Sequence, residues 1–330
     1  MKKTSLVIHT PSKHPLWRFP REKVDDLKRK FPQLDIHLIY DEEIDSLLLE
    51  NCEILVTGRI KPQDFKKAKN LKWIHSPFSG VGNFLFTEFV ESNVLLTNSR
   101  GVNAIPVVEH ILGLMFSFSR YLYLSWKYQK EKIWAQEIIW SQSPLPRELA
   151  GSTLGIIGLG EIGRRLAERA KKLEMRVLGI KKNINEKVPF VDIVLPLSQL
   201  DFLLNNSDYV VLVLPRTRET EGLMDYKRFK KMKKNSIFIN VSRGKLVKEK
   251  DLIRALKEGL ILAAGLDVFE EEPLPQNSEL FKLPNVIITP HIAGVSPNFW
   301  DNVYKLLSEN IERFLKGLPL INLVNKKEGY

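Results

Sequence analysis

The sequence predicts an α/β protein with two lobes, because short apolar strands alternate with helical segments along most of its 330 residues. Such alternation is typical of open parallel sheets whose faces are covered by helices. The length also suffices for two domains of ordinary size, each with its own core. In the first lobe the expected strands are Leu6–His9, Ile36–Tyr40, Ile54–Thr57, Trp73–His75 and Val94–Thr97, and the expected helices are Asp25–Phe31 and Gln63–Lys69.

A long apolar helix is expected next, from about Ala104 to Trp126, because its apolar side chains recur at helical spacing. An amphipathic helix from Asn298 to Leu315 is expected to return to the first lobe. We therefore place one domain at residues 1–100 and 297–330 and the other at residues 101–296. The expected downstream strands are Val210–Leu214, Ile237–Val241, Ala263–Leu266 and Val286–Thr289.

The most informative motif is the run Gly158-Leu159-Gly160-Glu161-Ile162-Gly163, because of the segments on either side of it. Before it lies Thr153–Ile157, typical of a buried parallel strand, and after it come a helical segment, Arg164–Leu173, and the strand Met175–Ile180. This context turns a weak G-x-G-x-x-G string into a dinucleotide-binding prediction. The helix N-terminus would supply N–H donors for the pyrophosphate. The alternative is a glycine-rich turn that binds no ligand.

Composition excludes several other classes of protein. Apolar residues make up 44% of the chain and charged residues 27%, as in soluble globular proteins, and no apolar run is long enough to span a bilayer. Cys52 is the single cysteine, and neither zinc-ligand spacing nor a signal peptide is evident, so we expect a cytoplasmic protein without a metal. The net charge is +11, but the lysines are scattered among acids, which favours a solvated basic surface over nucleic-acid binding.

Three kinds of reactive side chain follow expected strands of the second lobe, at the ends where open α/β sheets bind ligands. They are Arg243, the acids Glu270–Glu272 and His291. A guanidinium offers a planar fork of donors that matches a carboxylate. An imidazole can exchange a proton near neutral pH, and a carboxylate beside it orients it and favours its protonated form. Together these groups form the parts of a hydride-transfer site for 2-hydroxy acids, although each one alone is more often a surface residue.

Five sequence blocks resemble the signature motifs of the D-isomer-specific 2-hydroxyacid dehydrogenases. They are Thr97-Asn98-Ser99-Arg100-Gly101, Leu149-Ala150-Gly151-Ser152-Thr153-Leu154-Gly155, Asn240-Val241-Ser242-Arg243-Gly244, Gly265-Leu266-Asp267-Val268-Phe269-Glu270-Glu271-Glu272-Pro273 and Thr289-Pro290-His291-Ile292-Ala293-Gly294. The resemblance covers nearly the whole chain. It implies a Rossmann dinucleotide-binding domain inserted in a flavodoxin-like substrate domain. It also implies NAD(P)-dependent interconversion of a small 2-oxo acid and its D-2-hydroxy acid.

The same resemblance implies roles for individual residues. Arg243 would anchor the substrate carboxylate, His291 would be the general acid and base, and Glu272, the last of three consecutive acids, would be its partner. Ser79 and Gly80 would present backbone N–H groups to the substrate, which Arg243 and His291 would also bind. The coenzyme would contact Gly158, Gly160, Glu161, Ile162, Gly163, Lys181, Lys182, Leu214, Pro215, Thr220, Val241, Ser242, Asp267, His291 and Gly294.

The chain departs from the family's pattern where the coenzyme's ribose would bind. NAD-using members typically end the second strand of this unit with an aspartate, whereas here Lys181 and Lys182 follow Ile180. Two cations suit a 2′-phosphate, so we predict a preference for NADP, with NAD possible. The alternative is a solvent-facing lysine pair. A second departure is Gly82, where the family often has aspartate, and it removes no catalytic group.

Glyoxylate or hydroxypyruvate reduction, or a broader D-2-hydroxyacid activity, is favoured over a phosphoglycerate dehydrogenase-like enzyme, because no fused regulatory module is expected after the terminal helix. Formate dehydrogenase is disfavoured because its catalytic histidine pairs with glutamine and not with an acid such as Glu272. A dinucleotide-binding regulatory or corepressor-type protein is the alternative from another class, although the extended tail of such proteins is not evident.

Two further expectations concern the subunit and the remaining histidines. In relatives the segment before the glycine motif contributes to a dimer, so we expect a homodimer in which Trp134 approaches the partner. His110 is expected to pack or to cap a neighbour. The histidines of the first lobe are expected to be structural or exposed, namely His9, His14, His37 and His75.

Overall fold

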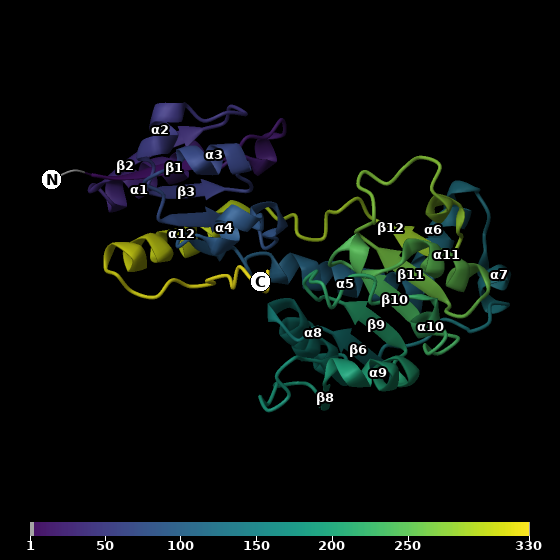
Figure 1. Ribbon diagram of the computed structural model, residues 1–330. Helices are drawn as coiled ribbons and strands as arrows, with labels where there is room; N and C mark the ends of the chain where they lie inside the picture. Colours follow the sequence, from purple (N-terminus) through teal and green to yellow (C-terminus); the bar gives the residue numbers. More distant parts are fainter. Residues whose placement is uncertain (1–2, 330) are drawn as a thin grey trace. The chain divides into compact units, whose positions relative to one another are not determined.

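The computed structural model describes residues 3–329, which form two compact units (Figure 1). The first unit contains the described residues up to Val102 and those from Ser296 onward, and the second unit contains Asn103–Val295. Each unit has one parallel sheet, which confirms the predicted α/β class. Within residues 3–329 no helix combines the length and the apolar character that crossing a bilayer requires.

The first unit is built on a five-stranded parallel sheet. Its strands are β1 (Thr4–His9), β2 (Leu34–Ile39), β3 (Ile54–Thr57), β4 (Trp73–Ser76) and β5 (Leu95–Asn98). Its helices are α1 (Arg21–Lys30), α2 (Ser46–Asn51), α3 (Pro62–Lys67), α4 (Thr87–Glu91) and α12 (Phe299–Leu315). The strand order is β2-β1-β3-β4-β5, with every neighbouring pair parallel, which is the order of flavodoxin-like folds.

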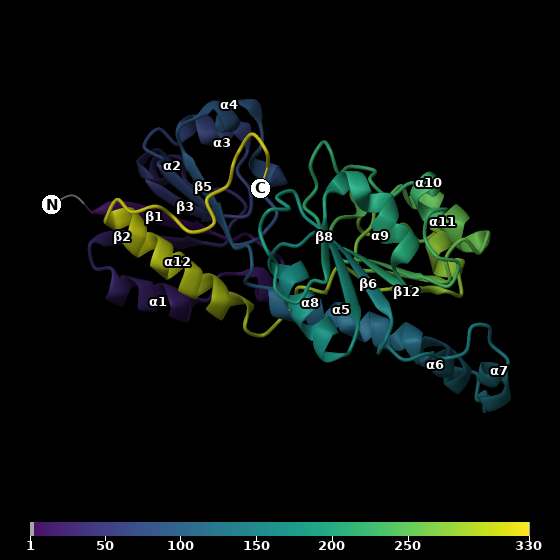
Figure 2. The ribbon, with the colours of Figure 1, turned by 90° about the horizontal axis from the view of Figure 1, so that it is seen from below.

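Helix α12 belongs to the first unit although it ends the chain. Its buried residues Val303, Leu307 and Ile311 recur every four positions and join the core formed by β1, β3 and α1. Polar contacts fix it beside α1, where Lys30 Nζ donates a hydrogen bond to Ser308 Oγ over 2.7 Å. The two helices run side by side in Figure 2. The amphipathic helix predicted at the end of the sequence therefore closes the first sheet.

The second unit is built on a seven-stranded parallel sheet. Its strands are β6 (Thr153–Ile157), β7 (Arg176–Ile180), β8 (Ile193–Leu195), β9 (Tyr209–Leu212), β10 (Ile237–Asn240), β11 (Ala263–Leu266) and β12 (Val286–Ile288). Its helices are α5 (Ala104–Ser119), α6 (Leu122–Lys130), α7 (Gln136–Trp140), α8 (Glu161–Lys172), α9 (Leu200–Asn206), α10 (Tyr226–Phe229) and α11 (Glu249–Lys257). The strand order is β12-β11-β10-β9-β6-β7-β8.

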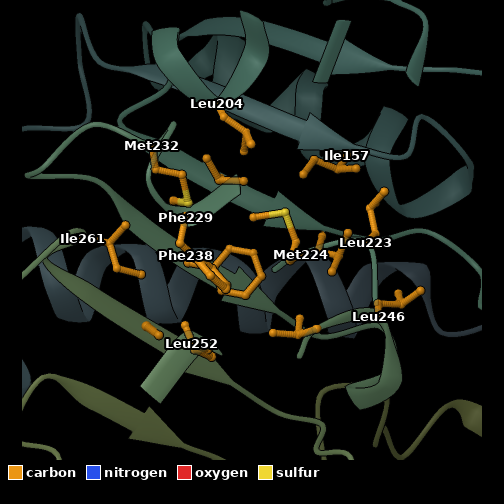
Figure 3. Packing of buried hydrophobic residues seen from close by; sticks show 14 of the residues in the cluster. Ile157, Leu204, Leu223, Met224, Phe229, Met232, Phe238, Leu246, Leu252 and Ile261 are labelled. Carbon is orange, nitrogen blue, oxygen red and sulfur yellow. The ribbon is translucent and has the colours of Figure 1, made fainter. Parts of the chain in front are cut away.

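Both faces of this sheet are buried, because alternate side chains of its strands point to opposite sides. Val210 and Phe238 contribute to a cluster on the side of α9 and α11, whose packing Figure 3 shows around Phe229 and Phe238. Val211 and Ile239 contribute to a cluster on the side of α5 and α8. The continuous apolar character of these strands in the sequence follows from this double burial.

The long helix predicted for residues 104–126 is in fact two helices, α5 and α6. The chain turns between them at Tyr121, whose φ of 53° is left-handed. The returning segment fixes this turn, because Arg147 N–H donates to Ser119 O over 2.9 Å and the Tyr121 hydroxyl donates to Pro144 O. The apolar pattern continues through the turn, so the sequence alone does not reveal the break.

Candidate active site

The predicted site residues of the second unit lie at one edge of its sheet. The segments that follow β6, β7, β9, β10, β11 and β12 carry them, and parallel strands end at a common edge. Strand β6 has β7 on one side and β9 on the other. Strands β7 and β8 extend the sheet on one side of β6, and β9 to β12 extend it on the other side. Open α/β sheets bind their ligands at such a switch point.

The glycine turn after β6 has the geometry of a dinucleotide cradle. Gly158 has φ of +119°, and a Cβ on it would lie 2.8 Å from Val213 O. A Cβ on Gly163 would lie 2.1 Å from Gly158 O, so the chain's own packing requires both glycines. A Cβ on Gly160 would meet no protein atom within 4 Å, so packing within the chain does not require glycine at that position. Gly160 is the N-cap of α8, so Glu161 and Ile162 begin the helix, at the end where backbone N–H groups can bind an anion.

His291 and Glu272 form the central pair of the site. His291 Nδ1 lies 2.6 Å from Glu272 Oε2, and both side chains are open to solvent, with exposed fractions of 52% and 36%. Glu272 Oε1 accepts a hydrogen bond from the backbone N–H of Phe269 over 3.0 Å, which fixes the carboxylate. With Nδ1 donating to the carboxylate, Nε2 is the nitrogen that can exchange a proton with a substrate.

Glu270 is engaged elsewhere, which distinguishes it from Glu272. Its Oε1 accepts a hydrogen bond from the backbone N–H of Glu249 over 2.9 Å, at the start of α11. Glu270 and Glu272 therefore have different hydrogen-bond partners although the sequence presents the two acids alike. The geometry agrees with the choice of Glu272 as the acid that meets His291.

The backbone at His291 is held in a left-handed conformation by Asp267 and Thr289. Its φ is 54°, and its N–H donates to Asp267 O over 2.9 Å and to Thr289 O over 3.0 Å. The buried carboxylate of Asp267 accepts the N–H groups of Ile292 and Ala293, each over 2.9 Å. A left-handed non-glycine residue persists where surrounding contacts determine it, and such residues cluster at active sites.

His110 on α5 extends this network and was not predicted to belong to the site. Its Nε2 lies 3.0 Å from Thr289 Oγ1, and that hydroxyl donates to Asp267 Oδ1 over 2.6 Å. Because the hydroxyl proton is committed to the carboxylate, His110 Nε2 must be the donor to Thr289. Thr289 lies 179 residues further along the chain than His110, so no local sequence pattern reveals the contact.

Arg243 follows β10 in a turn shaped by Asn240. The Asn240 side chain accepts from Ser242 N over 3.1 Å and donates to Arg243 O over 3.1 Å. A Cβ on Gly244 would lie 1.8 Å from the Phe269 backbone, so only glycine lets this turn rest on the segment that leads to Glu272. Although solvent reaches the guanidinium, neighbouring protein atoms desolvate it and lower the pKa of Arg243, and Glu272 opposes that shift. The group stays cationic.

The segment after β9 is tied to the one after β10. The Ser242 hydroxyl donates to Leu214 O, and the Thr220 hydroxyl donates to Pro215 O over 2.8 Å. Val241, which directly follows β10, is buried, with an exposed fraction of 8%. Gly294 closes the segment after β12, where a Cβ would lie 2.7 Å from Asn103 Nδ2.

Lys181 follows β7 directly, as predicted, and Lys182 comes next. The Lys181 side chain is 15% exposed and pairs with Glu186 Oε2. Arg164, in the first turn of α8, pairs with Glu186 Oε1 over 2.5 Å. Neither Arg164 nor Glu186 was singled out from the sequence, because each is one of many charged residues on expected surfaces.

Ser79 and Gly80 lie in the first unit, in an exposed loop after β4. Asn98 Nδ2 donates to Ser79 O over 2.8 Å, and Ser79 Oγ donates to Ser99 O over 3.4 Å. These bonds anchor the loop on the end of β5. The predicted contact of Ser79 and Gly80 with the substrate stays a prediction.

His75 is fully buried and contacts Ser99, the residue to which the Ser79 hydroxyl donates. Its Nδ1 lies 2.8 Å from Thr97 Oγ1, which also accepts from Trp73 Nε1, and its Nε2 lies 3.2 Å from Ser99 Oγ. The Ser99 hydroxyl donates to the backbone and therefore accepts from Nε2–H. Burial lowers the pKa of His75 to about 3, so the ring is neutral.

Comparison with known proteins identifies the family of the chain. The family model of the D-isomer specific 2-hydroxyacid dehydrogenase, NAD binding domain, matches residues 112–293. A glyoxylate reductase of Pyrococcus horikoshii is 35% identical over 320 residues, which cover 91% of this chain and 95% of that protein. A D-isomer specific 2-hydroxyacid dehydrogenase family protein from Aeromonas salmonicida has a solved structure with a TM-score of 0.82 and 33% identity, covering 99% of this chain and 100% of that one.

A further solved structure is that of the NADPH-dependent glyoxylate/hydroxypyruvate reductase from Sinorhizobium meliloti in complex with NADP and sulfate. It matches with a TM-score of 0.83 and 26% identity over 99% of this chain and 100% of that one. Fold and comparisons define a NAD(P)-dependent oxidoreductase that interconverts 2-oxo acids and 2-hydroxy acids. The chain belongs to the D-isomer-specific 2-hydroxyacid dehydrogenases, as its sequence motifs indicate.

Proposed function

We propose that the protein is an NADPH-preferring reductase of glyoxylate or hydroxypyruvate, in which Arg243, Glu272 and His291 carry the reaction. The observation that carries this proposal is the 2.6 Å contact between His291 Nδ1 and Glu272 Oε2 at the edge where the sheet binds its ligands. The names of the similar reductases support the substrate class.

The site residues of the second unit have separate roles in the proposed reaction. Arg243 holds the substrate carboxylate through its fork of donors and so presents C2 in one orientation. His291 delivers a proton from Nε2 to the oxygen on C2, and Glu272 stabilises the imidazolium before that transfer. The reduced nicotinamide, when bound, supplies the hydride to C2. Asp267, through the backbone of the His291 turn, keeps the imidazole in place.

We also propose that Lys181 and Lys182 select NADP through its 2′-phosphate. Lys181 is fixed for this purpose, because its backbone N–H pairs with Leu195 O over 2.9 Å. Both residues follow the strand whose end lies beside the adenosine ribose in a Rossmann unit. A Lys181→Asp variant should weaken NADPH binding much more than NADH binding. An equal effect on both coenzymes would remove the basis of this preference.

The homodimer remains a proposal, and the cytoplasmic location remains a prediction. Helices α6 and α7 extend away from the sheet of the second unit (Figure 2). Trp126 of α6, Trp134 of the link between the helices and Trp140 of α7 are 63%, 87% and 63% exposed. Large exposed apolar groups close together mark interaction surfaces. A second copy of the chain is the partner we propose for them.

A panel of glyoxylate, hydroxypyruvate, pyruvate and 3-phosphohydroxypyruvate, assayed with NADPH and NADH, tests the proposed function. We expect fastest oxidation of NADPH by glyoxylate or hydroxypyruvate. Fastest turnover of the phosphorylated acid would favour a phosphoglycerate dehydrogenase-like enzyme. Tight binding of NADPH without oxidation by any of the acids would favour a dinucleotide-binding regulatory protein.

A further inference from the structure

Glu186 pairs with two cations at the proposed 2′-phosphate site, Lys181 and Arg164. Its Oε2 pairs with Lys181 Nζ, and its Oε1 lies 2.5 Å from Arg164 Nη2. The hydrogen bonds from Lys181 and then Arg164 lower the pKa of Glu186 to about 2. The carboxylate is therefore charged at every pH at which the enzyme would work.

Glu186, Lys181 and Arg164 lie close to the segments that bind the adenosine ribose in a Rossmann unit. Arg164 stands in the first turn of α8, and its Nε donates to Leu159 O of the glycine turn over 3.3 Å. Lys181 stands at the end of β7. A Rossmann unit places the adenosine ribose between these two points, where an acid binds the 2′-hydroxyl and a cation binds a 2′-phosphate. Here an acid and two cations are already paired with one another.

Two anions cannot share these cations without mutual repulsion. A 2′-phosphate must displace the Glu186 carboxylate, whereas a 2′-hydroxyl can donate a hydrogen bond to it. Glu186 is 47% exposed, and exposed ion pairs are weak, so the exchange is feasible. The carboxylate would thus restrain the preference for NADPH without abolishing it.

Resting on the proposed preference for NADP, we propose that Glu186 is a specificity-determining residue that competes with the 2′-phosphate for Lys181 and Arg164. Arg164 is accordingly a further cation of the phosphate site, beside Lys181 and Lys182. Removing the carboxylate shifts the ratio of NADPH to NADH affinity toward NADPH. Removing Arg164 shifts it the other way.

The test is calorimetric titration of Glu186→Gln with adenosine 2′,5′-bisphosphate and with 5′-AMP, which need no turnover. Because the exposed Glu186 carboxylate no longer pairs with Lys181 and Arg164, we expect binding of the bisphosphate to tighten about three- to tenfold. Binding of 5′-AMP should be unchanged or weaker. Glu168→Gln is the matched control, because it removes an equal charge from an exposed ion pair with Lys172 on α8, the helix that carries Arg164. This variant should alter neither affinity.

An unchanged affinity of Glu186→Gln for the bisphosphate would overturn the inference. So would an equal gain in Glu168→Gln, since that would show an effect of net charge alone. In the Glu186→Gln background, Arg164→Gln should weaken bisphosphate binding, and the absence of an effect would contradict the role of Arg164 as a cation of the phosphate site. The proposed NADP preference is judged separately, by the wild-type ratio of the two affinities and by Lys181→Ala.

Discussion

His291 Nδ1 and Glu272 Oε2 meet at 2.6 Å although 19 residues separate them in the chain. Two loops create this contact, one after β11 and one after β12, and hydrogen bonds within the first loop and between the two loops fix it. Phe269 N–H holds the Glu272 carboxylate, and Asp267 holds the backbone on either side of the imidazole. The pair is thus preorganised within the second unit, which is what a general acid and its orienting partner require.

Loss of the Glu272 charge should slow the reaction more than it weakens binding. In Glu272→Gln we expect kcat to fall about tenfold to a thousandfold, because a neutral amide stabilises the imidazolium less. Steady-state kinetics with glyoxylate and NADPH measure this, with coenzyme affinity checked by fluorescence titration. Glu271→Gln is the control and should keep wild-type kcat. Equal losses in both variants would contradict the special role of Glu272.

Arg243→Ala should lose the anchor of the substrate carboxylate. We expect kcat/KM for glyoxylate to fall about a hundredfold or more, because a charge-assisted bidentate contact is removed. Arg243→Lys should recover only part of this loss, since an ammonium cannot form the fork. Retention of more than half of wild-type kcat/KM by Arg243→Ala would show that the carboxylate binds elsewhere.

His110 should act as a positioning residue through Thr289 and Asp267. In His110→Phe the hydrogen bond to Thr289 is lost, and we expect kcat to fall about threefold to thirtyfold with little change in KM. His110→Gln keeps an N–H donor and should restore much of kcat. If the two variants lost kcat equally, or if only thermal stability changed, His110 would have a purely structural role.

Acid should destabilise the first unit through His75. Its folded-state pKa of about 3 lies below the ordinary value of 6.5, so the unfolded chain binds an extra proton between these values. The stability contributed by the neutral ring is complete above pH 6.5 and is lost as pH falls toward 3. Over that window we expect this residue to reduce the free energy of unfolding by about 1.4 kcal/mol per pH unit.

Hydrogen exchange of the β4 amides between pH 6 and pH 4 measures this slope, after correction for intrinsic exchange rates. His75→Gln should have a shallower slope than the wild type, whereas exchange in His37→Gln, which alters an exposed ring, should follow the wild type. Identical slopes in all three proteins would show that His75 is not the group that titrates.

The α6–α7 segment should hold two copies of the chain together. In Trp134→Glu we expect the sedimentation coefficient to fall from that of a dimer to that of a monomer, because a charge cannot be buried without a partner. Lys132→Gln, on the same segment, controls for the change in net charge, because it also removes one unit of positive net charge. A monomeric wild type at micromolar concentration would refute the proposed dimer.

Much of the fold was predictable because its strands are buried on both faces. Ile54–Thr57, Thr153–Ile157 and Ala263–Leu266 have the bounds expected from their apolar character alone. The break at Tyr121 was not predictable, because Arg147 and Pro144 impose it from a later segment. Short elements such as β8 and α7 carry too few residues for a periodic pattern to show.

Some residues of the candidate site were likewise predictable from the sequence, and others were not. Arg243, Glu272 and His291 were predictable because each follows a strand within a recognisable motif. His110 and Glu186 were not, because their importance arises from partners that only the fold brings close. His110 lies on α5, at the start of the second unit, whereas its partner Thr289 lies near the end of that unit. Glu186 lies in an irregular loop beyond β7.

Transfer of deuterium to C2 of the substrate tests the central claim most directly. The protein is incubated with hydroxypyruvate and NADPH deuterated at C4, in separate samples for each of the two C4 positions, and the product is examined by NMR and chiral chromatography. We predict D-glycerate with deuterium at C2 from one labelled coenzyme, and almost none from His291→Ala at equal NADPH occupancy. Formation of no C2-labelled product by the wild type, or of equal amounts by His291→Ala, would contradict the account.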